Sequence, residues 1–313
     1  MKGRSLGAYL EYLLAAGLAK LMLRLPSPIA YRIGEALGWV LYLLDGRHRR
    51  IAAENLALAF NGRWDPREIT RTVRGVFLNL SRMGVEACRI PHLTADNVDQ
   101  FIQVEGYEHF KRAKAKGKGI LWITGHLGPW ELLPVASALN GEPLHIVVRP
   151  LDNTYLDEAV NRFRKWGGNT IIPKKQALRV VLEALKKGES VALLIDQNLT
   201  RKEGVFVEFF GRPACTTLAP ALLALRADAV VLPAAIFRRG RDRHTIVIGQ
   251  EIPLIRTGDL EADIVANTAR FTKAIEAFIR QAPDQWFWVH RRWKTQPLES
   301  RDSSLVMSDQ KQP

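Results

Sequence analysis

The pattern of apolar and polar residues divides the chain into two parts close to Pro91. Before this proline, apolar residues recur at helical spacing over long stretches. After it, short apolar runs rich in β-branched residues alternate with segments of helical periodicity, which is typical of an α/β fold. The sequence therefore predicts an N-terminal helical region (residues 1–95), an α/β domain (96–295) and a polar tail (296–313) that is expected to be disordered.

The expected fold class is α/β, with a mostly parallel central sheet flanked by helices. The predicted strands cover residues 102–104, 120–124, 144–148, 170–172, 191–195, 230–236 and 245–248. The predicted helices cover residues 6–25, 29–44, 51–60, 67–90, 108–116, 129–139, 155–166, 176–187, 217–226 and 260–281.

Composition changes this picture by suggesting what the protein binds. The formal net charge of +13 favours an anionic partner, which can be nucleic acid, anionic lipid or an acidic carrier protein. Charge alone does not choose among them. The two cysteines, Cys88 and Cys215, match no metal or redox spacing, so both are expected to be reduced and buried in a cytosol-facing protein.

The first predicted helix, residues 6–25, is strongly apolar, but three charged residues interrupt it: Glu11, Lys20 and Arg24. A membrane-spanning helix needs about 20 largely uncharged residues, and a signal peptide has a shorter apolar core before its cleavage site. We therefore expect a helix that lies on or shallowly in a membrane, with Lys2 and Arg4 near anionic head groups. An ordinary buried helix is the alternative.

The strongest candidate for chemistry follows the predicted strand 120–124, which ends at Gly125. His126 lies in the next loop, Gly128 and Pro129 are typical of a helix start, and Glu131 falls in the first helical turn. From there Glu131 can reach back to one imidazole nitrogen and leave the other free to accept a proton. The alternative is a structural histidine beside a glutamate that the helix dipole favours.

Other polar residues follow neighbouring predicted strands, where ligands of open α/β sheets bind. Arg149 and Asp152 follow the strand 144–148, and Asp196 and Gln197 follow the strand 191–195. Arginine is suited to two-point contact with an anion. We therefore expect one polar site at this edge of the sheet, around His126.

Several kinds of chemistry lack their motif. The sequence has no G-x-S-x-G, Walker A or G-x-G-x-x-G motif and no histidine and cysteine cluster at zinc spacing. A base without a neighbouring nucleophile favours direct deprotonation of a substrate hydroxyl. The covalent alternative is Cys215, which precedes the predicted helix 217–226 and would have a lowered pKa at a helix N-terminus.

The segment His126-Leu127-Gly128-Pro129-Trp130-Glu131 resembles the H-x4-[DE] motif of glycerolipid acyltransferases. Its H-x-G-x-W-E form is similar to the late acyltransferases of lipid A biosynthesis, the lauroyl and myristoyl transferases, within the lysophospholipid acyltransferase superfamily. The likeness extends over roughly residues 5–295. It includes residues 104–106, 118–120, 147–150, 195–197, 209–214, 217, 220 and 288–295.

The resemblance implies transfer of a fatty acyl chain from an acyl carrier protein or acyl-CoA thioester to a hydroxyl of a lipid A precursor, in lipopolysaccharide biosynthesis. It implies an enzyme without a metal or cofactor, at the cytoplasmic face of a bacterial inner membrane. The implied roles are general base for His126, its orienting partner for Glu131 and anion binder for Arg149. The expected substrate pocket adds Asp152, Asp196, Gln197 and Arg212, and the expected oxyanion loop contains Gly125, Gly128 and Trp130.

Pro129 departs from the family pattern, because asparagine is frequent at this position. The acceptor therefore stays open between a lipid A precursor, another glycolipid such as mannosylated phosphatidylinositol, and a lysophospholipid. Two other classes of function also remain: a non-catalytic basic lipid-binding protein, and a phospholipid hydrolase in which water replaces the acceptor hydroxyl. Nucleic acid is not an expected partner.

Overall fold

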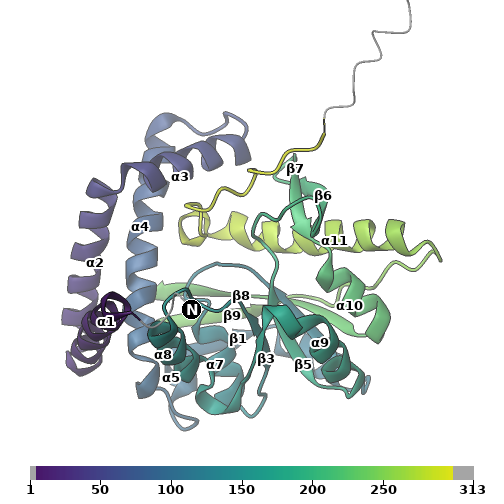
Figure 1. Ribbon diagram of the computed structural model, residues 1–313, viewed down its shortest axis with the longest axis horizontal. Helices are drawn as coiled ribbons and strands as arrows, with labels where there is room; N and C mark the ends of the chain where they lie inside the picture. The colour runs from purple at the N-terminus through teal and green to yellow at the C-terminus, as the bar shows by residue number, and fades with distance from the viewer. Residues whose placement is uncertain (1–4, 299–313) are drawn as a thin grey trace, which may run out of the picture.

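A computed structural model describes residues 5–298, which form helices around one seven-stranded sheet (Figure 1). The strand order is β1-β9-β8-β2-β5-β3-β4. Only β8 and β9 pair antiparallel, and the other neighbours in this sheet pair parallel. The predicted α/β class with a mostly parallel sheet is confirmed. Lys2, Arg4 and residues 299–313 lie outside the described residues.

Each predicted strand is present. The strands of the main sheet are β1 (Ile102–Glu105), β2 (Ile120–Thr124), β3 (His145–Val148), β4 (Thr170–Pro173), β5 (Ser190–Leu194), β8 (Val230–Gly240) and β9 (Arg243–Ile248). Their bounds differ little from the prediction, except that β8 continues to Gly240 and turns tightly into β9.

The predicted helices are also present. They are α1 (Leu6–Arg24), α2 (Ser27–Leu44), α3 (Gly46–Ala59), α4 (Pro66–Cys88), α6 (Tyr107–Lys114), α7 (Leu132–Leu139), α8 (Thr154–Arg164), α9 (Ala177–Lys186), α10 (Ala219–Ala227) and α11 (Leu260–Gln281). A short α5 (Val98–Phe101) was not predicted. α3 begins earlier than predicted because the Asp45 side chain caps it, accepting a hydrogen bond from the His48 N–H.

Both faces of the sheet are buried, as expected for parallel strands. Along β2, Leu121 and Ile123 belong to a core that α4, α9, α10 and α11 share, whereas Ile120 and Trp122 belong to a second core beneath α6 and α7. Successive side chains of a strand point to opposite faces. The end of β2 is therefore held from both sides, and the loop that contains His126 starts there.

Helix α4 fastens the N-terminal helices to the sheet through a buried ion pair. Glu86 accepts hydrogen bonds from Arg238 of β8 at 2.6 and 2.5 Å, from His244 of β9 at 2.9 Å and from Tyr31 of α2 at 2.9 Å. Burial raises the pKa of Glu86, but hydrogen bonds and charge from Arg238 and His244 outweigh it and hold the pKa at about 2. Glu86 is therefore ionised inside the protein.

A hairpin of β6 (Gly204–Phe209) and β7 (Arg212–Thr217) was missed by the prediction (Figure 1). The chain reverses at Phe210 and Gly211, which both have positive φ. Residues 212–217 therefore form a strand, and the following helix starts at Ala219 instead of residue 217. The hairpin packs beside α11.

Candidate active site

The loop that follows β2 is fixed by two glycines. A Cβ on Gly125 would lie 3.0 Å from Asp196 Oδ2 and 3.0 Å from Ile275 Cγ2, so only glycine lets this carboxylate approach closely. Gly128 has φ +59, and a Cβ there would lie 2.1 Å from the Ile236 carbonyl oxygen. The loop therefore holds His126 in one position at the carboxyl end of the sheet.

His126 is paired with Asp196, which follows β5, the strand next to β2. The imidazole Nδ1 lies 2.7 Å from Asp196 Oδ1, while Asp196 Oδ2 accepts hydrogen bonds from the His126 N–H and from Trp286 Nε1, both at 2.7 Å. Nδ1 donates to the ionised carboxylate, so the unprotonated nitrogen with a lone pair is Nε2. Nε2 lies 3.3 Å from the Gln197 side-chain nitrogen.

The structure corrects the predicted partner of His126. Glu131 receives two hydrogen bonds from Arg164, at 2.9 and 2.7 Å, and Asp196 takes the position at Nδ1 that we expected for Glu131. The physical reason is that α7 begins at Leu132, after a turn closed by the Leu132 N–H and the Pro129 carbonyl. Glu131 therefore precedes the helix and faces the end of α8, where Arg164 lies.

The charges of this pair are set by its burial and contacts. Burial raises the pKa of Asp196, but the His126 charge and the hydrogen bonds from His126 and Trp286 outweigh it and bring the pKa to about 2. Burial lowers the pKa of His126, but the Asp196 charge and hydrogen bond, with help from the Glu131 charge, raise it above its ordinary value. The carboxylate thus strengthens His126 as a base.

A C-terminal segment, residues 285–288, forms hydrogen bonds with the loop and packs against the imidazole. Phe287 N–H donates to the His126 carbonyl at 3.1 Å, and its ring lies 5.9 Å from the imidazole. The Trp130 and His126 rings pack edge to face, with 5.0 Å between their centres. The indoles of Trp286 and Trp288 are buried, so this segment is packed inside the protein.

Comparison of the sequence with known proteins identifies the family to which the chain belongs. Residues 2–295 match the family model described as bacterial lipid A biosynthesis acyltransferase. The chain belongs to this family. It is 30% identical over 304 residues to a lipid A biosynthesis acyltransferase of Haemophilus influenzae, covering 94% of each chain. It is also 29% identical over 290 residues to the lipid A biosynthesis lauroyltransferase of Escherichia coli, covering 91% of each chain.

A third relative differs in the acyl group that its name states. The chain is 28% identical over 293 residues to the lipid A biosynthesis palmitoleoyltransferase of Escherichia coli, covering 93% of this chain and 92% of the relative. The protein is thus an acyltransferase, as the motif at His126 predicted. Since the lauroyl and palmitoleoyl relatives are almost equally similar, overall identity does not select an acyl chain.

The remaining predicted site residues of this acyltransferase lie in different surroundings. Gln197 is beside His126. Arg149 and Asp152 are exposed in the loop between β3 and α8, and within the described residues no contact joins either to His126. Arg212 lies elsewhere: its guanidinium donates to the Leu58 carbonyl and the Asn61 side chain at the end of α3.

The predicted oxyanion loop is partly occupied by structural hydrogen bonds. The Gly128 N–H donates to the Gln285 carbonyl at 2.9 Å, and the His126 N–H donates to Asp196. The N–H groups of Trp130 and Glu131 have no acceptor among residues 5–298. These two N–H groups lie ahead of α7 and are available for a developing oxyanion.

Cys215 does not have the environment of a nucleophile. It lies inside β7 with a fully buried side chain, and its Sγ is 3.4 Å from the Thr200 carbonyl. Burial raises the pKa of the thiol, opposite to the lowered value that a helix N-terminus would give. The covalent alternative required Cys215 to lie at a helix N-terminus, and in the structure Cys215 lies in a strand instead.

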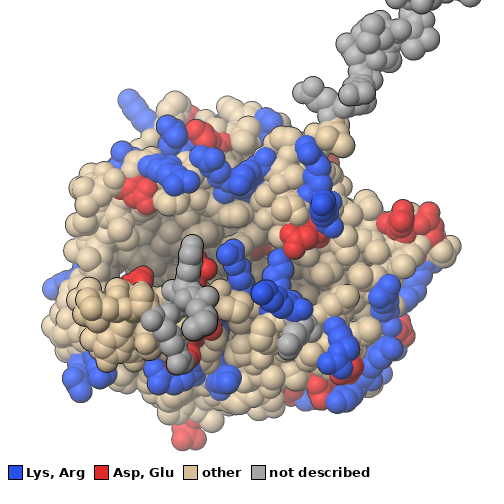
Figure 2. Space-filling view, in the orientation of Figure 1, with Lys and Arg blue, Asp and Glu red and all other residues tan. Residues whose placement is uncertain are grey.

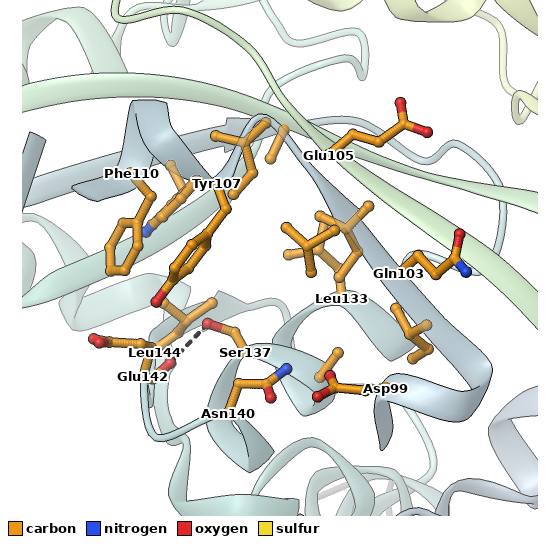
Figure 3. Close-up of a pocket in the computed structure, with 17 residues that line it drawn as sticks. Asp99, Gln103, Glu105, Tyr107, Phe110, Leu133, Ser137, Asn140, Glu142 and Leu144 are labelled. Carbon is orange, nitrogen blue, oxygen red and sulfur yellow. Dashed lines mark hydrogen bonds between the residues drawn. The ribbon is translucent and has the colours of Figure 1, made fainter. Parts of the chain in front are cut away.

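The residues around the candidate site that sequence reasoning missed are Arg164, Trp286 and Phe287, which contact Glu131, Asp196 and His126. No local motif marks them, because each reaches the loop only through the fold. A cavity of about 650 Å³ lies apart from this site, between α6 and α7 (Figure 3). Figure 3 shows Tyr107, Leu133 and Ser137 around it. Neither His126 nor Asp196 lines this cavity.

Proposed function

We propose that this acyltransferase moves a fatty acyl chain from an acyl carrier protein or acyl-CoA thioester to a hydroxyl of a lipid A precursor. The acyl transfer would take place at the cytoplasmic face of a bacterial inner membrane. The observation that carries the proposal is the His126–Asp196 pair, whose Nε2 lone pair faces away from the carboxylate. The relatives' names, which specify lipid A, support the acceptor.

In the proposed reaction, His126 Nε2 takes the proton of the acceptor hydroxyl as its oxygen attacks the thioester carbonyl. Asp196 stabilises the imidazolium that forms and keeps Nδ1 protonated. The N–H groups of Trp130 and Glu131 hold the oxyanion. When this intermediate collapses, the carbon–sulfur bond breaks, the proton on His126 passes to the leaving thiolate, and an ester and a free thiol result.

Glu131 and Arg164 would support this chemistry from beside the imidazole. Their two parallel hydrogen bonds fix the backbone ahead of α7, which carries the proposed oxyanion donors. The Glu131 charge also contributes to the raised pKa of His126. Glu131 therefore acts in the proposal as a positioning residue. The expected anion contact of Arg149 and the expected substrate contact of Asp152, both in the exposed loop after β3, remain part of the proposal.

The test is mass spectrometry of lipid A from cells that carry the protein, lack it, or carry His126→Ala. The proposal predicts a lipid A species heavier by one ester-linked acyl chain only with the unchanged protein. The mass of the added chain would identify the acyl group. An unchanged lipid A profile, with the difference instead in lysophospholipids or another glycolipid, would contradict the acceptor; no lipid difference at all would contradict the reaction.

A further inference from the structure

The N-terminal helix α1 raises a question that its composition alone does not answer. It is the one helix among the described residues that is long and apolar enough to cross a membrane. Its 19 residues correspond to about 28 Å of helix, close to the thickness of a bilayer's hydrocarbon core. Length therefore permits either a crossing or a flat orientation, and the contacts of the helix must decide.

The first end of α1 is attached to α8. The Asn153 side chain donates hydrogen bonds to the Ala8 carbonyl at 2.8 Å and to Glu11 Oε2 at 2.9 Å. The rings of Tyr9 and Tyr12 pack against Tyr155, at 5.3 and 6.0 Å between ring centres. Because Asn153 also caps α8, this end is fixed to the rim of the α/β domain close to the loop after β3.

The second end of α1 is attached to the same folded body through α4 and the residues after it. Arg89 donates to the Met22 and Leu25 carbonyls at 3.0 and 2.8 Å, and His92 Nε2 lies 2.8 Å from the Leu23 carbonyl. The Met22 side chain is buried against Val85. Both ends of α1 therefore rest on one domain, and a crossing helix would have to release one of them.

The outer face of α1 is a continuous stripe of leucines. Leu6, Leu10, Leu13, Leu14, Leu18 and Leu21 recur at helical spacing, and between 45% and 77% of each is exposed. The small residues Ala8, Ala16 and Ala19 face the protein instead. Figure 2 shows this surface as mostly uncharged at the lower left, with Lys and Arg side chains at its margin. An unpartnered apolar stripe of this length marks an interaction surface.

Helix α2 extends this surface. Its inner face packs closely on α4, since a Cβ on Gly38 would lie 3.2 Å from the Phe77 carbonyl oxygen. Its outer residues Leu37, Val40, Leu41 and Leu44 are exposed. α1 and α2 lie together at the left edge of Figure 1. We call these outer faces, defined by the leucine stripe of α1 and the four named residues of α2, the α1–α2 surface.

We propose that α1 lies flat in the head-group region of an anionic bilayer and does not cross it, with the α1–α2 surface as the inserted face. Charge supports this occupant as well as apolarity: exposed Lys20 and Arg24 lie on α1, Arg32 lies on α2, and Arg47 and Arg50 lie on α3, which follows α2 in the chain. This inference builds on the proposed function, because a lipid acceptor would enter from the layer on which the enzyme rests.

Topology is tested by labelling single cysteines at the two ends of α1. Ser5→Cys and Arg24→Cys are made separately in a chain with Cys88→Ala and Cys215→Ala, and a membrane-impermeant maleimide is applied to spheroplasts and to inverted membrane vesicles. The proposal predicts that both positions react only in inverted vesicles. Reaction of Ser5→Cys in spheroplasts, with Arg24→Cys protected there, would show that α1 crosses the membrane and would overturn the proposal.

The surface is tested by binding to vesicles of phosphatidylethanolamine and phosphatidylglycerol. We expect vesicle binding to weaken at least about tenfold in each of two double variants, because each loses apolar side chains that would insert into the bilayer. The variants are Leu10→Glu with Leu14→Glu, and Leu41→Glu with Leu44→Glu. The control is Leu178→Glu with Leu260→Glu, at similarly exposed leucines of α9 and α11. Unchanged binding by both pairs, or monomerisation of an oligomer instead of lost binding, would overturn the proposal.

The two tests are independent of the reaction. Labelling and vesicle binding are repeated with His126→Ala, which is expected to bind membranes as the unchanged protein does. Activity on a detergent-dispersed acceptor is measured for the two leucine pairs and is expected to persist. Failure of the topology prediction with intact activity would overturn the flat orientation alone, whereas absent acyl transfer with intact binding would overturn the proposed function alone.

Discussion

At the scale of single residues, Asp196 connects three parts of the chain. Its carboxylate contacts the His126 ring and backbone and the Trp286 indole. Each hydrogen bond that the carboxylate accepts favours its ionised form. The pKa of Asp196 is therefore low although the side chain is buried. One substitution at this position therefore changes both the electrostatics and the geometry of the base.

Asp196→Asn is expected to lower kcat by roughly 10²-fold or more, within the range that a positioned base contributes. It should also shift the acidic limb of the pH–rate profile to lower pH. The sign follows because His126 acts as a base only when neutral, and the Asp196 charge raises its pKa. The measurement is kcat/KM against pH, with the exposed Asp96→Asn as control. An acidic limb that stays in place would contradict the assigned partnership.

Cys215→Ala is expected to retain most activity, because the buried thiol of β7 has a raised pKa and takes no part in the proposed reaction. The companion measurement is intact-protein mass after incubation with the thioester donor alone, which should reveal no acyl adduct. A stoichiometric adduct that disappears when acceptor is added would contradict direct transfer and leave the acyltransferase family assignment unchanged.

At the scale of elements, the Glu86 network holds α4 and α2 against β8 and β9. Removing one partner of a buried ion pair costs more than the pair contributes, because the other charge stays buried without compensation. In this network Glu86 is the only carboxylate that Arg238 contacts among the described residues. The stability of the whole N-terminal attachment therefore depends on this side chain.

Glu86→Gln is expected to lower the free energy of unfolding by about 3–5 kcal/mol, since it leaves the Arg238 guanidinium buried without a carboxylate. Chemical denaturation followed by circular dichroism measures this. The matched control is Glu54→Gln, which removes an exposed pair with Arg50 and should leave the midpoint unchanged. Equal midpoints for the two variants would contradict the anchoring role of Glu86.

The elements also show what a single sequence can and cannot predict. Strand β2 was predicted with its observed bounds, because an apolar run that ends at a glycine carries its own signal. The β6–β7 hairpin was missed because Pro213 interrupts the apolar alternation of its second strand, and proline usually argues against a strand. Arg212 was therefore taken for a site residue, although it fastens the hairpin to α3.

At the scale of the whole molecule, the site depends on the order of strands in the sheet. His126 was found from its motif, but its carboxylate partner could not be chosen, because local sequence does not reveal that β5 lies beside β2. Glu131 is five residues from His126 and was the natural expectation; Asp196 is seventy residues away in the chain. Trp286 and Phe287, still further along, were beyond the reach of any local pattern.

Two of the buried carboxylates, Glu86 and Asp196, give the whole fold an acid dependence. Glu86 and Asp196 both have a pKa of about 2 in the folded chain, below the ordinary value of about 4 in an unfolded one. A lowered folded-state pKa gives stability that is present above about pH 4 and is lost as the pH falls towards 2. Thermal midpoints measured across this range should fall steeply, and less so in Glu86→Gln; parallel curves would contradict the assignment.

The central claim is that His126 acts as the base while an acyl chain passes directly from a thioester to a lipid hydroxyl, and it is tested most directly with the purified protein. Acyl thioester and a lipid A precursor are supplied together, and free thiol and new ester are measured for the unchanged protein and for His126→Ala. The account predicts equal amounts of thiol and ester, and a rate about 10²–10⁴ times lower in the variant. Thiol release without ester, or a variant within a few-fold of the unchanged rate, would contradict it.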